Sequence, residues 1–217
     1  MDLFSRSWSA LRAAVADTPD EDFARPSGCA GRLVRDLVCH LVIDAQDVLI
    51  TLVTPATTAP TADAVTSWEP VEPPTGDDPL DALLPRLAAA YGDPGLLRFH
   101  LDDVGSAAGR AAQLADPAAL VGTRGQVLTA GDYLSAYVLE WTVHHLDLIA
   151  HLPAAARPPA ETPAAARGAP ERIAVAPFPA SFTDEAALLV GTGRRAPTSE
   201  ETAALGPLAA RLPFVLG

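Results

Sequence analysis

Residues 132–151, DYLSAYVLEWTVHHLDLIAH, constrain the fold more than any other stretch. Read as a helix, this segment is apolar on nearly every face, so we expect it to be buried almost all round. Steps of four and three residues nevertheless place a polar, titratable row on one face: Tyr133, Tyr137, Glu140, His144, Asp147 and His151. Ionisable groups in a core are costly unless they are paired or bind a metal. The row therefore predicts a hydrogen-bonded network or a set of ligands.

A second segment, roughly residues 32–53, has the same character. Its sequence, RLVRDLVCHLVIDAQDVLITLV, has the apolar spacing of a long helix. The corresponding row changes from apolar to ionisable halfway along: Leu33, Leu37, His40, Asp44, Asp47 and Thr51. Two long helices with polar residues at inward positions predict a helical bundle with a site in its core.

The remaining pattern predicts an all-α chain. Apolar periodicity indicates helices at 3–15, 80–91 and 96–114, with a kink or a displaced start at Pro85, and no stretch shows convincing strand alternation. Residues 54–79 predict a long surface connection, in which Trp68 is a lid residue or pins the loop to the bundle. Thr129 is the expected N-cap of the helix at 132–151.

The C-terminal part has a different composition. Residues 153–170 are rich in Pro and Ala, which is typical of a linker or of an extended segment wrapped over the surface. Short helices are expected at 184–190 and 199–210. We therefore predict a bundle at 1–152 and, at 153–217, a linker with a short helical extension packed on the bundle.

The charge balance excludes some partners. The chain has 217 residues and a formal net charge of −12, which argues against nucleic-acid or anionic-membrane surfaces because both require positive charge. Cys29 and Cys39 do not make a disulfide framework, and we expect Cys39 to be a small buried thiol. Neither a secretory leader nor an apolar run of roughly 18 residues is evident. A cytoplasmic protein is expected, and its oligomeric state stays open.

The spacing of Glu140 and His144 permits a shared metal ion. Residues four apart on a helix have Cβ atoms about 5–6 Å apart. Two neutral imidazoles and one carboxylate would give a divalent ion three protein ligands and an open position, which is the pattern of catalytic sites. Zn²⁺ suits these ligands, and Fe²⁺ or Ni²⁺ can use them too. The alternative is a buried Glu–His pair with His40 elsewhere.

Four further residues are candidates for the chemistry. Asp147 can accept the second ring N–H of His144, or else is a solvent-facing residue at the helix end. Asp44 is a candidate general acid or base. Arg194 and Arg195 lie in the segment GTGRR, which could bind an anion but lacks a phosphate-loop signature, so an ordinary surface turn is the alternative.

Two segments resemble a known family. RLVRDLVCHL (32–41) and YVLEWTVHHLDL (137–148) resemble the signature helices of the mycothiol-dependent maleylpyruvate isomerase N-terminal family, in the DinB-like superfamily. Those helices typically read V-x-D-L-x-x-H-L and E-x-x-x-H-x-x-D. The resemblance covers roughly residues 1–152 and implies an up-and-down four-helix bundle. It also implies a divalent metal, usually zinc, held by His40, Glu140 and His144, with mycothiol as co-substrate. An aromatic residue commonly opens the first motif, where this chain has Gly31 or Arg32, and the tail does not resemble the isomerase's α/β C-terminal domain.

The resemblance implies an enzyme that uses a small-molecule thiol and an electrophilic substrate. A metal-bound sulfur is deprotonated, and the thiolate is the nucleophile. It could isomerise a double bond or end in S-transfer, with Asp44 or Asp147 moving protons or orienting ligands. Arg194 and Arg195 could contact an anionic substrate or the thiol's polar head. Two alternatives stay open: a thiol-independent isomerase, cyclase or hydrolase with a metal as Lewis acid, and a non-catalytic bundle with a relic site.

Overall fold

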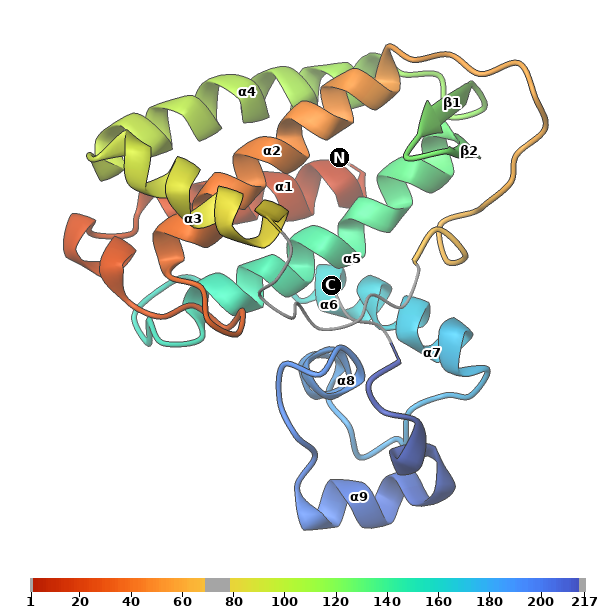
Figure 1. The fold of residues 1–217 in the computed structure, drawn as a ribbon. Helices are drawn as coiled ribbons and strands as arrows, with labels where there is room; N and C mark the ends of the chain where they lie inside the picture. Colours follow the sequence, from red (N-terminus) through yellow and green to blue (C-terminus); the bar gives the residue numbers. More distant parts are fainter. Residues whose placement is uncertain (1, 69–78, 215–217) are drawn as a thin grey trace.

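The structure, a computed structural model, describes residues 2–68 and 79–214, except for the side chains of residues 79–81. It is mostly helical, with one small hairpin in the described part of the chain (Figure 1). None of the helices in that part is long and apolar enough to cross a membrane. In chain order the elements are α1 (Leu3–Ala16), η1 (Asp20–Ala24), α2 (Val34–Leu52), α3 (Pro79–Tyr91), α4 (Pro94–Leu114), β1 (Leu120–Thr123), β2 (Gln126–Thr129), α5 (Ala130–Ile149), α6 (Glu161–Ala166), α7 (Gly168–Ala174), α8 (Asp184–Gly191), α9 (Ser199–Leu205) and η2 (Gly206–Arg211).

Helix α5 is the centre of the fold. It is buried almost all round, as the sequence predicts, and Ser135 is its one exposed residue. The predicted N-cap is confirmed, because the Thr129 hydroxyl oxygen accepts the backbone N–H of Asp132 at 3.0 Å. The helix ends at Ile149, slightly before the predicted boundary.

Helices α1, α2, α4 and α5 contribute to one apolar core. Trp8 of α1 stacks on Trp141 of α5, with ring centroids 4.0 Å apart. The Trp8 indole N–H also donates to the backbone oxygen of Gly105 in α4, at 2.8 Å. Gly105 permits this approach, since a Cβ there would lie 2.6 Å from Trp8 Cζ2. The stacked indoles thus join three helices of the core.

The hairpin β1–β2 corrects the expectation that the chain contains no strand. Its antiparallel register pairs Thr123 with Gln126 around a two-residue turn, Arg124-Gly125, in which both residues have positive φ. Such turns match the twist of the two strands. Each strand has only four residues, too few for alternation to stand out in the sequence. Part of the 54–68 loop is held here, since Thr61 N–H donates to Val127 O at 2.8 Å.

The C-terminal segment is more regular than predicted. Residues 161–174 form α6 and α7 where the composition suggests an extended linker, and the helix expected at 199–210 divides into α9 and η2. An apolar cluster joins this segment to α5 through Leu139, Val143, Leu146, Ala166, Ala169 and Leu188. Burial against α5 explains why such short helices form, because isolated helices of this length are unstable in water. The domain division at residue 152 stays a prediction.

Candidate metal centre

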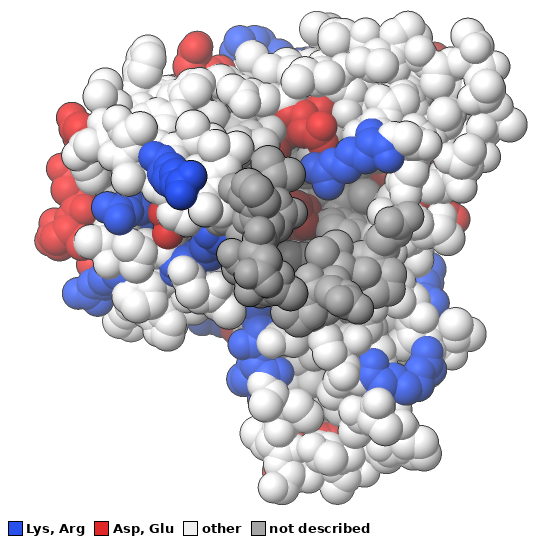
Figure 2. Space-filling model, in the orientation of Figure 1, with Lys and Arg blue, Asp and Glu red and all other residues white. Residues whose placement is uncertain are grey.

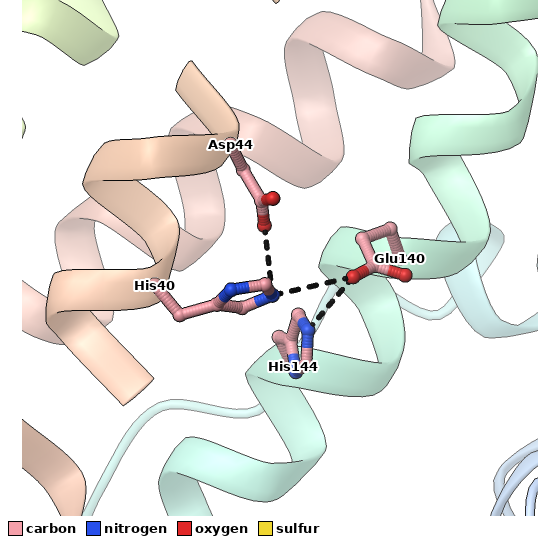
Figure 3. Close-up of side chains that lie close together, drawn as sticks. All are labelled: His40, Asp44, Glu140 and His144. Carbon is pink, nitrogen blue, oxygen red and sulfur yellow. Dashed lines mark hydrogen bonds and ion pairs between the residues drawn. The ribbon is translucent and has the colours of Figure 1, made fainter. Parts of the chain in front are cut away.

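Two helices bring four polar side chains to one point. His40 and Asp44 lie one turn apart on α2, and Glu140 and His144 lie one turn apart on α5 (Figure 3). Glu140 Oε1 lies 2.9 Å from His144 Nε2 and 3.5 Å from His40 Nε2. Asp44 Oδ2 lies 3.3 Å from the same His40 nitrogen. One carboxylate oxygen therefore lies between the Nε2 atoms of two imidazoles.

Asp147 lies on the other side of His144. Its Oδ2 atom is 3.1 Å from His144 Nδ1, and its side chain is 1 % exposed, so it is not a solvent-facing helix-end residue. The Cys29 thiol donates to the same oxygen at 3.1 Å. Arg194 Nη2 lies 3.2 Å from it. Each ring nitrogen of His144 thus lies beside a carboxylate, Glu140 at Nε2 and Asp147 at Nδ1. The Asp147 carboxylate is in turn paired with Arg194.

The two candidate arginines have different surroundings. Arg194 is 8 % exposed and contacts Asp147, whereas Arg195 makes two 2.7 Å contacts with Glu201, which also caps α9. Neither arginine is among the residues that line the cavity beside His40. Contact of either guanidinium with an anionic substrate or with a thiol's polar head stays a prediction.

Burial and close charges shift the acid–base properties of the centre. Burial raises the pKa of Glu140, but the neighbouring histidines outweigh it and hold that pKa well below its usual value. Burial lowers the pKa of His144, yet Glu140 and then Asp147 outweigh it and raise that pKa well above its usual value. Burial raises the pKa of Asp44 to about 6. The shifts of Glu140 and His144 have a common cause, the 2.9 Å contact between the Glu140 oxygen and His144 Nε2.

A cavity of about 150 Å³ opens beside these groups. Figure 2 shows acidic atoms in the hollowed part of this face. The cavity is lined by His40, Asp44, Asp47, Ser67, Trp68, Thr123, Arg124, Gln126, Leu128, Tyr133, Ala136, Tyr137 and Glu140. Three residues of the centre, His40, Asp44 and Glu140, therefore border this cavity.

Asp47 is the centre of a second set of polar side chains that line the cavity. It accepts hydrogen bonds from the hydroxyls of Tyr133 and Tyr137, at 3.2 and 3.0 Å, and pairs with Arg124 at 3.4 Å. Arg124 could not be identified as a site residue from the sequence, because it reaches the cavity only through the hairpin turn. The dipeptide Arg-Gly between two short apolar runs is the one signal that could have indicated it.

Three further residues, Trp68, His145 and Cys39, lie outside the group of four side chains. Trp68 packs against the cluster that joins α5 to α6 and α8, and it also lines the cavity. Its role as a lid residue stays a prediction. Its indole N–H has no hydrogen-bond partner within the described ranges. His145 is buried and lies 2.9 Å from the backbone oxygen of Ala156. Cys39 is a buried thiol as predicted, with its pKa raised by burial.

The residues present fit a divalent ion. One ligand atom each from His40, Asp44, Glu140 and His144 lies within 4.8 Å of the others. Asp44 Oδ2 is buried and has no hydrogen-bond partner among the described residues, although His40 is close. Imidazole nitrogens and carboxylate oxygens are ordinary ligands of zinc and related ions. A cation held by His40, Glu140 and His144 would place a positive charge near that oxygen.

A helical core with a histidine–carboxylate cluster between two helices defines a class of helical protein with a candidate metal site. The chain belongs to the family described as the mycothiol maleylpyruvate isomerase N-terminal domain, whose model matches residues 4–149. No curated protein and no solved structure matches the chain. The predicted family is confirmed, and α6 to η2 lie outside the matched region.

Proposed function

We propose that this protein is a metal-dependent enzyme that uses a thiol, mycothiol, as an isomerase or S-transferase of a small electrophilic substrate. One observation carries the proposal. The Nε2 atoms of His40 and His144 lie within 3.5 Å of a single Glu140 oxygen, and His40 and Glu140 line a cavity. The family's printed description supplies the thiol and the isomerase class. The fold proposed with it is the DinB-like up-and-down four-helix bundle of α1, α2, α4 and α5.

In this proposal His40, Glu140 and His144 hold the ion, and the cavity admits the thiol. A bound divalent ion, Zn²⁺ or else Ni²⁺ or Fe²⁺, would stabilise the thiolate form of the sulfur. Asp147 accepts the Nδ1–H of His144, which leaves the Nε2 lone pair directed at the centre. Asp44 is a buried acceptor beside the cavity and takes the proton that the thiol loses.

The thiolate then attacks an electrophilic carbon of a double bond. The S–C bond forms while the π electron pair moves to the neighbouring carbon. Rotation about the new single bond followed by loss of the thiolate gives the isomer. Return of the proton from Asp44 to that carbon gives a stable thioether instead. Both outcomes balance without an oxidant or reductant.

Elemental analysis tests the first half of this proposal. Protein purified without chelators or a metal-binding tag should contain close to one divalent metal per chain. A metal content far below one per chain would overturn the proposal of a metal-dependent enzyme if added ions do not restore it. That result would favour a non-catalytic bundle.

Turnover of a panel of electrophiles with and without mycothiol tests the second half. We expect turnover that requires the thiol and is lost in His144→Ala. His100→Ala is the control, because His100 lies on α4 beside Tyr91 and outside the centre. Turnover independent of thiol would favour a metal-assisted isomerase, cyclase or hydrolase.

A further inference from the structure

We propose that Arg194, from the C-terminal segment outside the family match, is a positioning residue of the metal centre and holds His144 in place through Asp147. The proposal rests on the function proposed above. The family region then contributes the ligands, and the segment that follows it completes the site.

The contacts form a chain from the tail to the ligand. Arg194 Nε lies 3.4 and 3.3 Å from the two carboxylate oxygens of Asp147, and Nη2 lies 3.2 Å from Oδ2. The same Oδ2 is 3.1 Å from His144 Nδ1. A carboxylate whose two oxygens both contact a guanidinium has a defined orientation, because the guanidinium group is planar and rigid. The acceptor that orients His144 is therefore itself oriented by Arg194.

Burial makes this partner necessary. The side chains of Asp147 and Arg194 are 1 % and 8 % exposed, so water solvates their charges poorly. A buried ionised carboxylate without a cation is strongly unfavourable. The anion that this arginine contacts is thus an internal carboxylate, in contrast to Arg195, which pairs with Glu201 nearer the surface.

The main chain on both sides holds the pair in place. The Gly28 N–H donates to the backbone oxygen of Asp147 at 2.8 Å, and a Cβ on Gly28 would lie 2.7 Å from Asp147 Oδ1. In the tail, Arg195 N–H donates to Leu189 O at 3.0 Å, and Gly193 provides the positive φ of the turn. Arg194 therefore emerges from an ordered turn that follows α8.

The positive charge of Arg194 also limits which ions the side chains around Asp147 can bind. Cys29, His144 and Asp147 offer ligand atoms within 4.8 Å of one another, which resembles a second cation site. The guanidinium already lies against the Asp147 carboxylate and repels a further cation. Arg194 thus supplies the positive charge of this cluster, and we expect one metal per chain rather than two.

The test is Zn²⁺ affinity of the full chain, measured by competition with a chromophoric chelator, in Arg194→Met and Arg194→Lys. Loss of an outer partner of a metal-bound histidine typically costs 10- to 100-fold in affinity, so we expect about that loss for Arg194→Met and a smaller one for Arg194→Lys. Arg195→Met is the matched control, with an expected change of less than about twofold. The absorption spectrum of the Co²⁺-loaded protein should change in Arg194→Met and not in the control, because it reports ligand geometry.

A double-mutant cycle distinguishes positioning from simple attachment of the tail. If Arg194 acts through Asp147, Arg194→Met should change Zn²⁺ affinity little in an Asp147→Asn background. Wild-type affinity and an unchanged Co²⁺ spectrum in the folded Arg194 variants would overturn this inference alone. If Arg194→Met does not fold, the same two measurements on Arg194→Lys decide. Failure of the unmodified protein to bind metal would overturn the proposed function as well.

Discussion

The imidazole rings of His40 and His144 meet edge to face, with centroids 4.9 Å apart and ring planes at 84°. One ring comes from α2 and the other from α5, and Glu140 lies within reach of both Nε2 atoms. In the proposed metal-loaded state both rings would act as neutral ligands of one ion.

Replacing the shared carboxylate should abolish tight metal binding. Glu140→Gln removes the one negative charge between the two imidazoles, and we expect Zn²⁺ affinity to fall by at least about 100-fold, beyond the usual effect of an outer partner. Thermal unfolding gives a second readout, since Zn²⁺ at 100 times its Kd stabilises the unmodified protein by about 2.7 kcal/mol. That increment should vanish in the variant. Glu201→Gln makes the same chemical change in the tail and should retain both the affinity and the increment.

Asp44→Asn should separate catalysis from metal binding. The amide nearly preserves the shape of the side chain but cannot take the proton of an incoming thiol. We expect kcat of the thiol-dependent reaction to fall by about 10²- to 10⁴-fold, the usual contribution of a general base, while metal content stays near one per chain. Steady-state kinetics and elemental analysis on the same preparation check this. Loss of metal along with activity would instead make Asp44 a fourth ligand.

Two glycines on α4 should respond in opposite ways to alanine. At Gly105 a Cβ would lie 2.6 Å from Trp8 Cζ2, so Gly105→Ala displaces the stacked indoles and should lower the free energy of unfolding by about 1–3 kcal/mol. At Gly109 a Cβ would lie 3.7 Å from Trp8 Cδ1, an ordinary van der Waals contact. Gly109→Ala should therefore stabilise the helix by about 0.4–1 kcal/mol. Urea unfolding of both variants measures the difference, and equal effects would contradict the packing argument.

The tail should contain an acid-sensitive contact. Arg195 and the start of α9 lower the pKa of Glu201 from 4.5 to about 2. A carboxyl group whose pKa is lower in the folded state stabilises the fold above its unfolded pKa, and this contribution is lost as pH falls from about 4.5 to about 2. Glu201→Gln should therefore be less stable than the unmodified protein at pH 7. The difference should shrink toward pH 2, as followed by denaturant unfolding at each pH. A difference that does not depend on pH would contradict the assigned cause.

Much of the helical core could be predicted from the sequence because the signals for helices are local. Helical spacing is a property of consecutive residues, so the long helices and the Thr129 cap are predicted with small boundary errors. The row containing Glu140 and His144 follows from the same geometry. The hairpin could not be found in this way, since four-residue strands have almost no pattern. The helices at 161–174 escaped as well, because burial against α5 rather than composition stabilises them.

By itself, therefore, the sequence determined the helical class, the family, and the residue types that face inward on residues 32–53 and 132–151. Only the tertiary structure decided which of these residues meet. It brought His40 to Glu140, placed Arg124 at the cavity through a turn, and directed Arg194 to Asp147 instead of to the cavity. The physical reason is that a helix periodicity specifies the face of each side chain, whereas contacts between distant segments depend on how those faces pack and on which buried charges must be paired.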